Sequence, residues 1–264
     1  MKIGFIGCGN MGGALARATA GAGHDVLIFD KNSALAEATA GELGGAVYSD
    51  SRALAADADV IFLGVKPNIV PEVLDELCEA LRGRKDCLLV SMAAGVTLAS
   101  IESRLGFPFP IIRIMPNTPV AVGEGMILWC KSDSVTDELA KGFTDAMSKA
   151  GRLSRLDEAK IDAGTAVSGC GPAFVYMFID ALASGGETCG LTREEALAYA
   201  CQTVIGAAEM TLASDRTPTE LRDAVCSPGG STIEGVKTLL GKDFATIVES
   251  AVEASYKRTQ ELGK

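Results

Sequence analysis

The first half of the chain alternates short apolar runs with longer segments whose apolar residues recur every three or four positions. The runs Lys2–Ile6, Asp25–Phe29, Asp59–Val65 and Asp86–Ser91 are almost continuously apolar, as expected for strands of a parallel sheet that is covered on both faces. Helical periodicity between the strands predicts a doubly wound α/β sheet. Further strands are predicted at 46–48, 111–115 and 125–130, and helices at 11–22, 34–43, 51–56, 69–81 and from 97 onward.

Beyond about residue 135 the strand pattern stops and every segment is predicted to be helical. At 264 residues the chain is near the upper limit for one hydrophobic core, so two domains are expected. We place an α/β domain at 1–155 and an all-helical domain at 156–264. The helices of the second half are predicted at 136–150, 157–167, 172–184, 193–213, 220–225, 231–240 and 244–262.

The predicted helix at 172–184 is unusual because Ala173–Ile179 is apolar nearly all round. A helix of this kind needs apolar partners on every side. A small helical domain buries it best against a second copy of the chain, which predicts a homodimer. The alternative is a central core helix in a monomer.

A glycine pattern follows the first predicted strand directly, in the sequence Gly7-Cys8-Gly9-Asn10-Met11-Gly12. Gly7 permits a tight turn, Gly9 lets the backbone approach a pyrophosphate, and Gly12 allows the helix to pack closely on the strand. Asp30 ends the second strand, where a dinucleotide fold places the acceptor for a ribose hydroxyl. The pattern predicts a Rossmann-type domain that binds NADH or NADPH. A plain tight turn is the alternative.

Composition narrows the classes of partner. The net charge of −10 argues against nucleic acid, which requires a basic face. No apolar run approaches the length that a bilayer requires, so no membrane partner is expected. Eight cysteines without a C-x-x-C pair and one histidine predict no metal site. The first residues already form the strand and glycine pattern, which leaves no room for a signal peptide. We therefore expect a cytoplasmic protein.

Three further segments carry candidate chemistry. Gly64-Val65-Lys66-Pro67 and Met92-Ala93-Ala94-Gly95 follow two predicted strands, at the sheet edge where dinucleotides bind. Both could instead be turns that only end a strand. Ser227–Thr232 opens a helix with two glycines and two hydroxyl residues, which would make a cradle for an anion. A well-capped helix start is the alternative reading.

These segments together resemble one family, the pyrroline-5-carboxylate reductases. The resemblance covers nearly the whole chain and includes the glycine pattern, the Val-Lys-Pro and Ala-Ala-Gly turns, and the closing run Ala251–Ser255. Its most specific parts are Met115–Pro119, Ser168–Ala173 and Ser227–Thr232.

The resemblance implies an NAD(P)H-dependent reduction of the cyclic imine 1-pyrroline-5-carboxylate to L-proline. It implies that Thr232 is catalytic and holds the ring nitrogen, that Ser231 helps to hold the carboxylate, and that Glu158 lies near the substrate. Family members interlock their helical domains as dimers, which can assemble further into decamers. The implied cofactor contacts are Gly7, Cys8, Gly9, Asn10, Met11, Gly12, Asp30, Lys31, Ser33, Ser51, Gly64, Val65, Lys66, Pro67, Met92, Ala93 and Ala94.

This sequence departs from the family at two positions. Ser51 stands where relatives often have Asn near the adenosine ribose, and Ala224 stands where relatives can carry a cofactor-contacting Asn.

The choice between NADH and NADPH has two interpretations. Asp30 favours NADH because it accepts from the ribose 2′-hydroxyl, whereas Lys31 and Ser33, with Asn32, could cradle the 2′-phosphate of NADPH. We expect use of both, with NADH favoured more than is usual in the family.

Two other functions remain open from the sequence. A β-hydroxyacid dehydrogenase shares the domain order but needs a lysine for the alcohol proton, and Gly169–Ala183 contains none. A non-catalytic dinucleotide sensor would lack the substrate loop, which is intact here at Ser227–Thr232.

Overall fold

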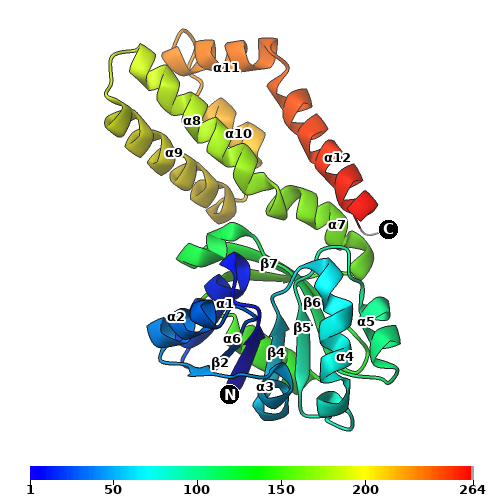
Figure 1. Ribbon diagram of the computed structural model, residues 1–264. Helices are drawn as coiled ribbons and strands as arrows, with labels where there is room; N and C mark the ends of the chain where they lie inside the picture. The colour runs from blue at the N-terminus through cyan, green and yellow to red at the C-terminus, as the bar shows by residue number, and fades with distance from the viewer. Residues whose placement is uncertain (263–264) are drawn as a thin grey trace. The chain divides into compact units, whose positions relative to one another are not determined.

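The computed structural model describes residues 1–262, and the chain divides into two compact units. The first unit contains Met1–Cys170 together with the chain from Ser255 onward, and the second contains Gly171–Ala254. The predicted fold class, a Rossmann-type sheet followed by a helical domain, is confirmed (Figure 1). The domain boundary expected at residues 155–156 stays a prediction.

The first unit is built on an eight-stranded sheet in the order β3-β2-β1-β4-β5-β6-β7-β8. All neighbouring strands are parallel except β6 and β7, which pair antiparallel. The strands are β1 (Lys2–Ile6), β2 (Asp25–Phe29), β3 (Ala46–Val47), β4 (Val60–Leu63), β5 (Leu88–Ser91), β6 (Ile111–Met115), β7 (Gly125–Lys131) and β8 (Gly151–Arg155).

The strand order reverses between β1 and β4. The chain runs outward from β1 through β2 to β3, then crosses back and continues from β4 on the other side of β1. The carboxyl ends of β1 and β4 therefore part to form a crevice, which is where open α/β sheets bind their ligands. Gly7 and Gly64 are the residues that follow these two strands.

Helices cover both faces of the sheet, which explains the continuously apolar strands. Alternate residues of β4 separate into two cores: Val60 and Phe62 join one, Ile61 and Leu63 the other. The first core is covered by α1 (Asn10–Gly21), α2 (Ser33–Leu43) and α6 (Asp137–Ala146). The second is covered by α3 (Ser51–Asp57), α4 (Val70–Leu81) and α5 (Leu98–Leu105).

The structure corrects the prediction that strands stop at about residue 135. Helix α6 ends at Ala146, and the chain returns as β8, which pairs in parallel with β7. This edge strand has the sequence Gly-Arg-Leu-Ser-Arg and is only half-buried, so it lacks the apolar pattern of the inner strands. Helix α2 begins at Ser33, one residue before its predicted start, and its N-cap is Asn32.

The segment predicted as one helix at 157–167 is instead three short helical pieces. A 3₁₀ turn at Glu158–Lys160 leads into α7 (Ile161–Gly164) and then into a π-helical turn at Thr165–Gly169. Single π-turns inside helices occur frequently at functional sites. This one contains the start of the predicted family motif Ser168–Ala173. The other 3₁₀ turns of the first unit are Pro67–Ile69 and Thr118–Val122.

The second unit is helical, as predicted. Capping boxes at Thr192 with Glu195 and at Thr217 with Glu220 set the starts of α9 and α10, because each pair satisfies backbone N–H groups that a helix start leaves free. The helices are α8 (Gly171–Thr188), α9 (Arg193–Ala213), α10 (Pro218–Ala224), α11 (Ser231–Gly241) and α12 (Phe244–Leu262), of which α12 belongs to this unit only as far as Ala254.

The continuous helical stretch Glu158–Thr188 is long and apolar enough to cross a bilayer by length and composition alone, which corrects the expectation that no apolar run approaches that length. That is weak evidence, because core helices of soluble proteins pass the same test.

Candidate active site

Each of the three glycines in the first loop is explained by a different feature of its surroundings. Gly7 has a φ of +93°, a conformation that other residues rarely adopt. A Cβ at Gly12 would lie 2.2 Å from the Gly7 carbonyl oxygen, so helix α1 packs too closely there for any side chain. A Cβ at Gly9 would meet no atom within 4 Å, and its φ is −61°. Within residues 1–262 no packing or backbone constraint requires glycine at position 9, so we attribute this glycine to the approach of a ligand.

Asp30 at the end of β2 is anchored to this loop. Its Oδ2 accepts a hydrogen bond from the Cys8 amide at 2.9 Å, and its Oδ1 accepts one from the Asn32 amide at 2.8 Å. Oδ2 also accepts a hydrogen bond from the Cys8 thiol at 3.5 Å, so Oδ1 is the oxygen that keeps a lone pair for a ribose hydroxyl. Burial, with Asp30 adding to it, raises the pKa of the Cys8 thiol above its usual range, so Cys8 is a neutral part of the loop.

A cavity of about 520 Å³ opens beside Asp30, between the ends of β2 and β3, and Lys31 and Ser33 line it as well. The Lys31 ammonium lies 2.8 Å from a Glu72 carboxylate oxygen, and both side chains are exposed. Ser51 does not line this cavity: it is buried, and its hydroxyl donates to Glu76 at 2.9 Å.

The turns after β4 and β5 complete this edge of the sheet. The Gly64 amide donates to the carbonyl of Ile6, and a Cβ at Gly64 would lie 2.3 Å from the Gly7 carbonyl oxygen. The two loops therefore touch through their backbones. Lys66 and Pro67, in the next turn of the chain, are exposed. The structure thus brings the loops after β1, β2 and β4 together, as the sequence predicts. The residues fit a dinucleotide: an open Gly9, free N–H groups at the start of α1 and an anchored carboxylate.

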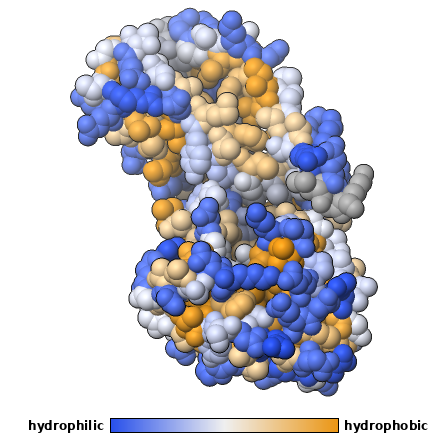
Figure 2. All heavy atoms as spheres, viewed as in Figure 1, coloured by the Kyte–Doolittle hydropathy of each residue, from blue (hydrophilic) through white to orange (hydrophobic). Residues whose placement is uncertain are grey.

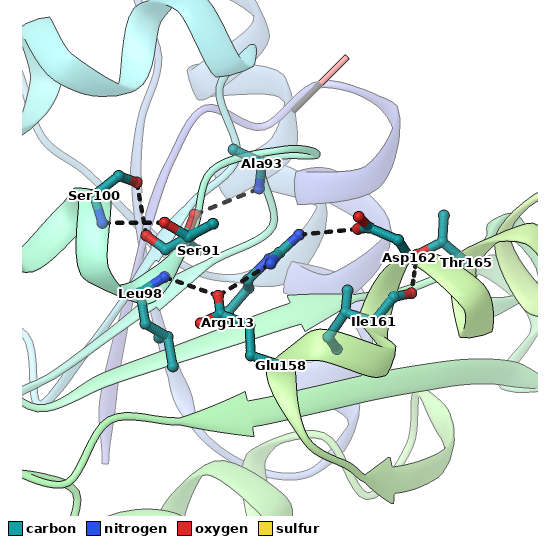
Figure 3. Close-up of polar contacts among 10 residues, drawn as sticks. Ser91, Ala93, Leu98, Ser100, Arg113, Glu158, Ile161, Asp162 and Thr165 are labelled. Carbon is teal, nitrogen blue, oxygen red and sulfur yellow. Dashed lines mark hydrogen bonds and ion pairs between the residues drawn. The ribbon is translucent and has the colours of Figure 1, made fainter. Parts of the chain in front are cut away.

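Glu158 belongs to an ion-pair network in the first unit (Figure 3). Its Oε1 accepts hydrogen bonds from the Leu98 amide at 2.9 Å and from Arg113 Nη1 at 3.0 Å. Arg113 Nη2 lies 3.6 Å from Asp162 Oδ1. The Arg113 side chain is only 4% exposed, and its Nε has no hydrogen-bond partner among the described residues.

Sequence reasoning missed Arg113. The available signal was one arginine in the middle of the otherwise apolar strand Ile-Ile-Arg-Ile-Met. A buried charge in such a place is expected only where it is paired.

Asn117 was also missed as a contact, although its motif was recognised. Its side-chain amide donates to the carbonyl of Ser168 at 2.9 Å, and its Oδ1 accepts from the Met126 amide at 2.8 Å. In a regular helix the Ser168 carbonyl would accept from the amide of residue 172, but Pro172 has no N–H. Asn117 therefore supplies the donor that Pro172 removes, next to the π-helical turn.

The loop at Ser227–Thr232 belongs to the second unit. Gly229 has a φ of +71°, and Gly230 is the N-cap of α11 without a side-chain cap. The first N–H groups of α11 therefore face outward with a partial positive charge. Ser231 and Thr232 are exposed, and within residues 1–262 neither hydroxyl has a hydrogen-bond partner. Both side chains are free to hold a ligand.

The second unit also carries an apolar groove between α8, α11 and α12, with a cavity of about 520 Å³. Met177, Phe178 and Phe244 line it and are exposed. Hydrophobic residues gather on the visible face of this unit (Figure 2). The predicted all-round apolar helix is α8, and within this chain only Ala183 of it is buried.

Among residues 1–262 no cluster of three or more His, Cys, Asp or Glu side chains is placed to hold a metal ion. All eight cysteines are free thiols.

Comparison with known proteins agrees with the two units. A family profile described as "Pyrroline-5-carboxylate reductase dimerisation" matches residues 158–262, and one described as "NADP oxidoreductase coenzyme F420-dependent" matches residues 2–95. Pyrroline-5-carboxylate reductase 2 of Homo sapiens is 39% identical over 270 residues, which cover 99% of this chain and 84% of that protein. The pyrroline-5-carboxylate reductase of Escherichia coli (strain K12) is 37% identical, with 100% and 98% covered. This chain belongs to the pyrroline-5-carboxylate reductase family.

Solved structures of the family have the same fold over the whole chain. A pyrroline-5-carboxylate reductase from Coxiella burnetii matches with a TM-score of 0.92 at 33% identity, covering 99% of this chain and 98% of that one. The Plasmodium falciparum pyrroline carboxylate reductase with NADP bound matches with a TM-score of 0.87 at 34% identity, covering 100% and 98%.

The sequence resemblance is therefore confirmed, and with it the enzyme class and the NAD(P)H cofactor. The helical region matches the family's dimerisation domain, so the chain self-associates. A Mycobacterium tuberculosis 3-hydroxyisobutyrate dehydrogenase shares only the fold, at 16% identity and a TM-score of 0.54.

Proposed function

We infer that the protein reduces 1-pyrroline-5-carboxylate to L-proline with NADH or NADPH. The observation that carries this inference is the uncapped start of α11, where two glycines are followed by two hydroxyls that have no hydrogen-bond partner within residues 1–262. It lies in a chain that matches curated reductases of this name over nearly its full length.

The substrate's charges suit this loop. Its carboxylate is an anion, which the free N–H groups and positive end of α11 favour. Its protonated imine already carries the positive charge that attracts hydride, so no strong general acid is required. When bound, the reduced nicotinamide supplies that hydride. We assign Thr232 to the ring nitrogen and Ser231, with the neighbouring backbone amides, to the carboxylate.

The cofactor contacts are part of the same proposal. The loop Gly7–Gly12 and the start of α1 hold the pyrophosphate. Asp30, Lys31 and Ser33 contact the adenosine ribose. Ser51 is assigned to the ribose by the family resemblance alone, because its buried hydroxyl donates to Glu76 and does not line this cavity. The turn Gly64–Pro67 and the loop Met92–Ala94 contact the rest of the cofactor. The family resemblance places Glu158 near the substrate, but its hydrogen bonds within the chain are with the Leu98 amide and Arg113.

The test is reduction of 1-pyrroline-5-carboxylate, followed by the loss of nicotinamide absorbance. Thr232→Ala should lower kcat/KM roughly 10- to 100-fold, the value of one hydrogen bond to a charged group, and should leave cofactor binding nearly intact. Thr238→Ala is the matched control, because that hydroxyl on the same helix already donates to the Glu234 carbonyl. An unchanged kcat/KM in Thr232→Ala would remove Thr232 from the site.

Cofactor preference is a separate prediction. Asp30 and Glu37 both line the cavity at the end of β2, and Lys31 is paired with Glu72. This acidic balance favours the 2′-hydroxyl of NADH over the 2′-phosphate of NADPH. We expect activity with both cofactors and an NADH share larger than is usual in the family. The ratio of the two kcat/KM values measures it, and a strong preference for NADPH would contradict it.

The functional unit in this proposal is a cytoplasmic homodimer, which can assemble further into decamers. The apolar groove of the second unit supports the dimer, and eight free thiols match a reducing compartment. The net charge of −10 supports the absence of nucleic-acid partners, and no membrane partner is proposed.

A further inference from the structure

We propose that Arg113 is a positioning residue that, through Glu158, holds the loop Met92–Leu98 in its working conformation. The proposal rests on the proposed function, in which this loop contacts the cofactor. It also assigns Glu158 to the loop rather than to the substrate. Figure 3 draws the side chains of Arg113, Glu158 and Asp162 together with Leu98, whose amide donates to Glu158.

The loop has a weak anchor at its first end and a strong one at its last. Near β5, the Ala93 amide donates to the Ser91 hydroxyl at 3.4 Å, and the Val96 amide donates to the Ala93 carbonyl at 3.3 Å. This second hydrogen bond closes a local turn in which Gly95 has a φ of +76°. At the last end the Leu98 amide donates to the Glu158 carboxylate at 2.9 Å. A charged acceptor makes this the strongest of the three contacts.

Glu158 needs Arg113 to stay in place. It lies in a 3₁₀ turn and its side chain is 30% exposed, whereas Arg113 comes from the middle of β6 with 4% exposed. The guanidinium also faces Asp162 on α7, so one rigid group joins two carboxylates. Its buried Nε has no partner among the described residues, which costs free energy. An apolar residue at this strand position would give a more stable fold. We therefore attribute the presence of arginine to its contacts with Glu158 and Asp162.

The apolar contacts of the loop point to the same role. Ala94 and Leu98 pack on a small cluster formed by Met115, Leu128, Cys130 and Ile161. Ile161 precedes Asp162 on α7, and Met115 ends the strand that carries Arg113. The loop therefore rests on residues whose backbone the ion pairs fix. Small displacements of a reacting group cost large factors in rate, about 100-fold for about 1 Å.

The experiment compares Glu158→Ala, Glu158→Gln and Arg113→Lys in the full-length protein, with Asp157→Asn as matched control. Asp157 is the neighbouring carboxylate and is largely exposed, and among residues 1–262 its only ion pair is with Lys160 at the surface. Four quantities are measured: hydrogen exchange of the peptide that contains Leu98, the dissociation constant of NADPH, and the kcat and the KM for the imine.

We expect exchange at Leu98 to rise roughly 10- to 100-fold in Glu158→Ala, as expected for loss of one charged hydrogen bond. The kcat should fall by a similar factor, whereas the NADPH dissociation constant and the KM for the imine should change less than about threefold, because the other cofactor contacts and the α11 loop are untouched. Glu158→Gln keeps an acceptor for Leu98 and should recover most of both losses. Arg113→Lys keeps the positive charge but loses the planar guanidinium that contacts two carboxylates. Its Leu98 exchange and its kcat should lie between those of Glu158→Ala and the wild type. Asp157→Asn should match the wild type.

Two outcomes would overturn the proposal. A raised KM for the imine with unchanged exchange at Leu98 would make Glu158 a substrate contact. Unchanged exchange and unchanged kinetics in Glu158→Ala would make the network irrelevant to the loop. Hydrogen exchange and NADPH binding need no turnover, so a protein inactive on the imine would refute the proposed function and still decide the role of Arg113.

Discussion

The two compact units place their large apolar side chains in opposite ways. In the first unit the inner strands are buried on both faces, and Phe5, Phe62 and Phe143 are fully covered. In the second unit the buried apolar cluster consists of three alanines, Ala183, Ala196 and Ala200. Met177 and Leu212 there are each 73% exposed. The first unit closes its own core, whereas the second has the composition of a core that is completed by another copy.

This difference predicts two kinds of stability. The free energy of unfolding of the first unit should not depend on protein concentration. The second unit should gain stability with concentration, because association with another copy favours its folded form by mass action.

The largest expected effect is on the self-contained core. Phe62→Ala should lower the free energy of unfolding by about 3–5 kcal/mol, because the ring stacks on Phe5 at a centroid distance of 4.7 Å and is fully buried. Urea titrations of the variant and the wild type at two protein concentrations give the measurement. Met126→Ala, at a half-buried position of the same sheet, is the milder comparison. A loss for Phe62→Ala that grows on dilution would show that this core also depends on association.

The next effect tests the incomplete core. Met177→Glu puts a charge into the groove between α8 and α12, where an unpaired carboxylate would have to be buried on association. Self-association should weaken by roughly 100-fold or more, measured by sedimentation equilibrium. Val122→Glu is the control in the first unit, since Val122 is 77% exposed and a surface substitution there should be nearly neutral. Equal association constants for Met177→Glu and the wild type would mean that this groove is not the interface.

The smallest effect concerns pH. Burial raises the pKa of the Cys87 thiol from 9.0 to about 12, so the unfolded chain loses this proton before the folded protein does. The stability that Cys87 contributes is therefore complete below pH 9 and is lost as the pH rises towards 12, by up to about 1.4 kcal/mol per pH unit. Urea midpoints between pH 8 and 10.5 should fall less steeply in Cys87→Ala than in the wild type. Cys189→Ala, at an exposed thiol of the second unit, should follow the wild-type slope.

Much of the fold could be predicted because its signals are local. The strands β2 and β6 and the helices α9 and α12 have the predicted bounds, since continuous apolar runs and long periodic segments depend on nearby residues. Strand β8 could not be predicted, because its place is fixed by pairing with β7 and its own five residues carry no apolar pattern.

The candidate site divides in the same way. The glycine pattern at positions 7, 9 and 12 could be recognised from its spacing and from the strand and helix that flank it, because all of these signals lie within a few residues. Arg113 and Asn117 could not be predicted, because their partners Glu158 and Ser168 lie 45 and 51 residues away in the chain. Only the fold brings such pairs together.

The hydrogen bond from Asn117 to Ser168 has a consequence for how this sequence can change. Pro172 withdraws one donor from the helix and Asn117, in another part of the chain, returns it. Replacing Asn117 alone leaves a half-buried carbonyl without that donor, and replacing Pro172 alone creates an N–H that competes for the same oxygen. The two positions are therefore coupled, and we expect tolerated substitutions at 117 and 172 to occur together more often than separately.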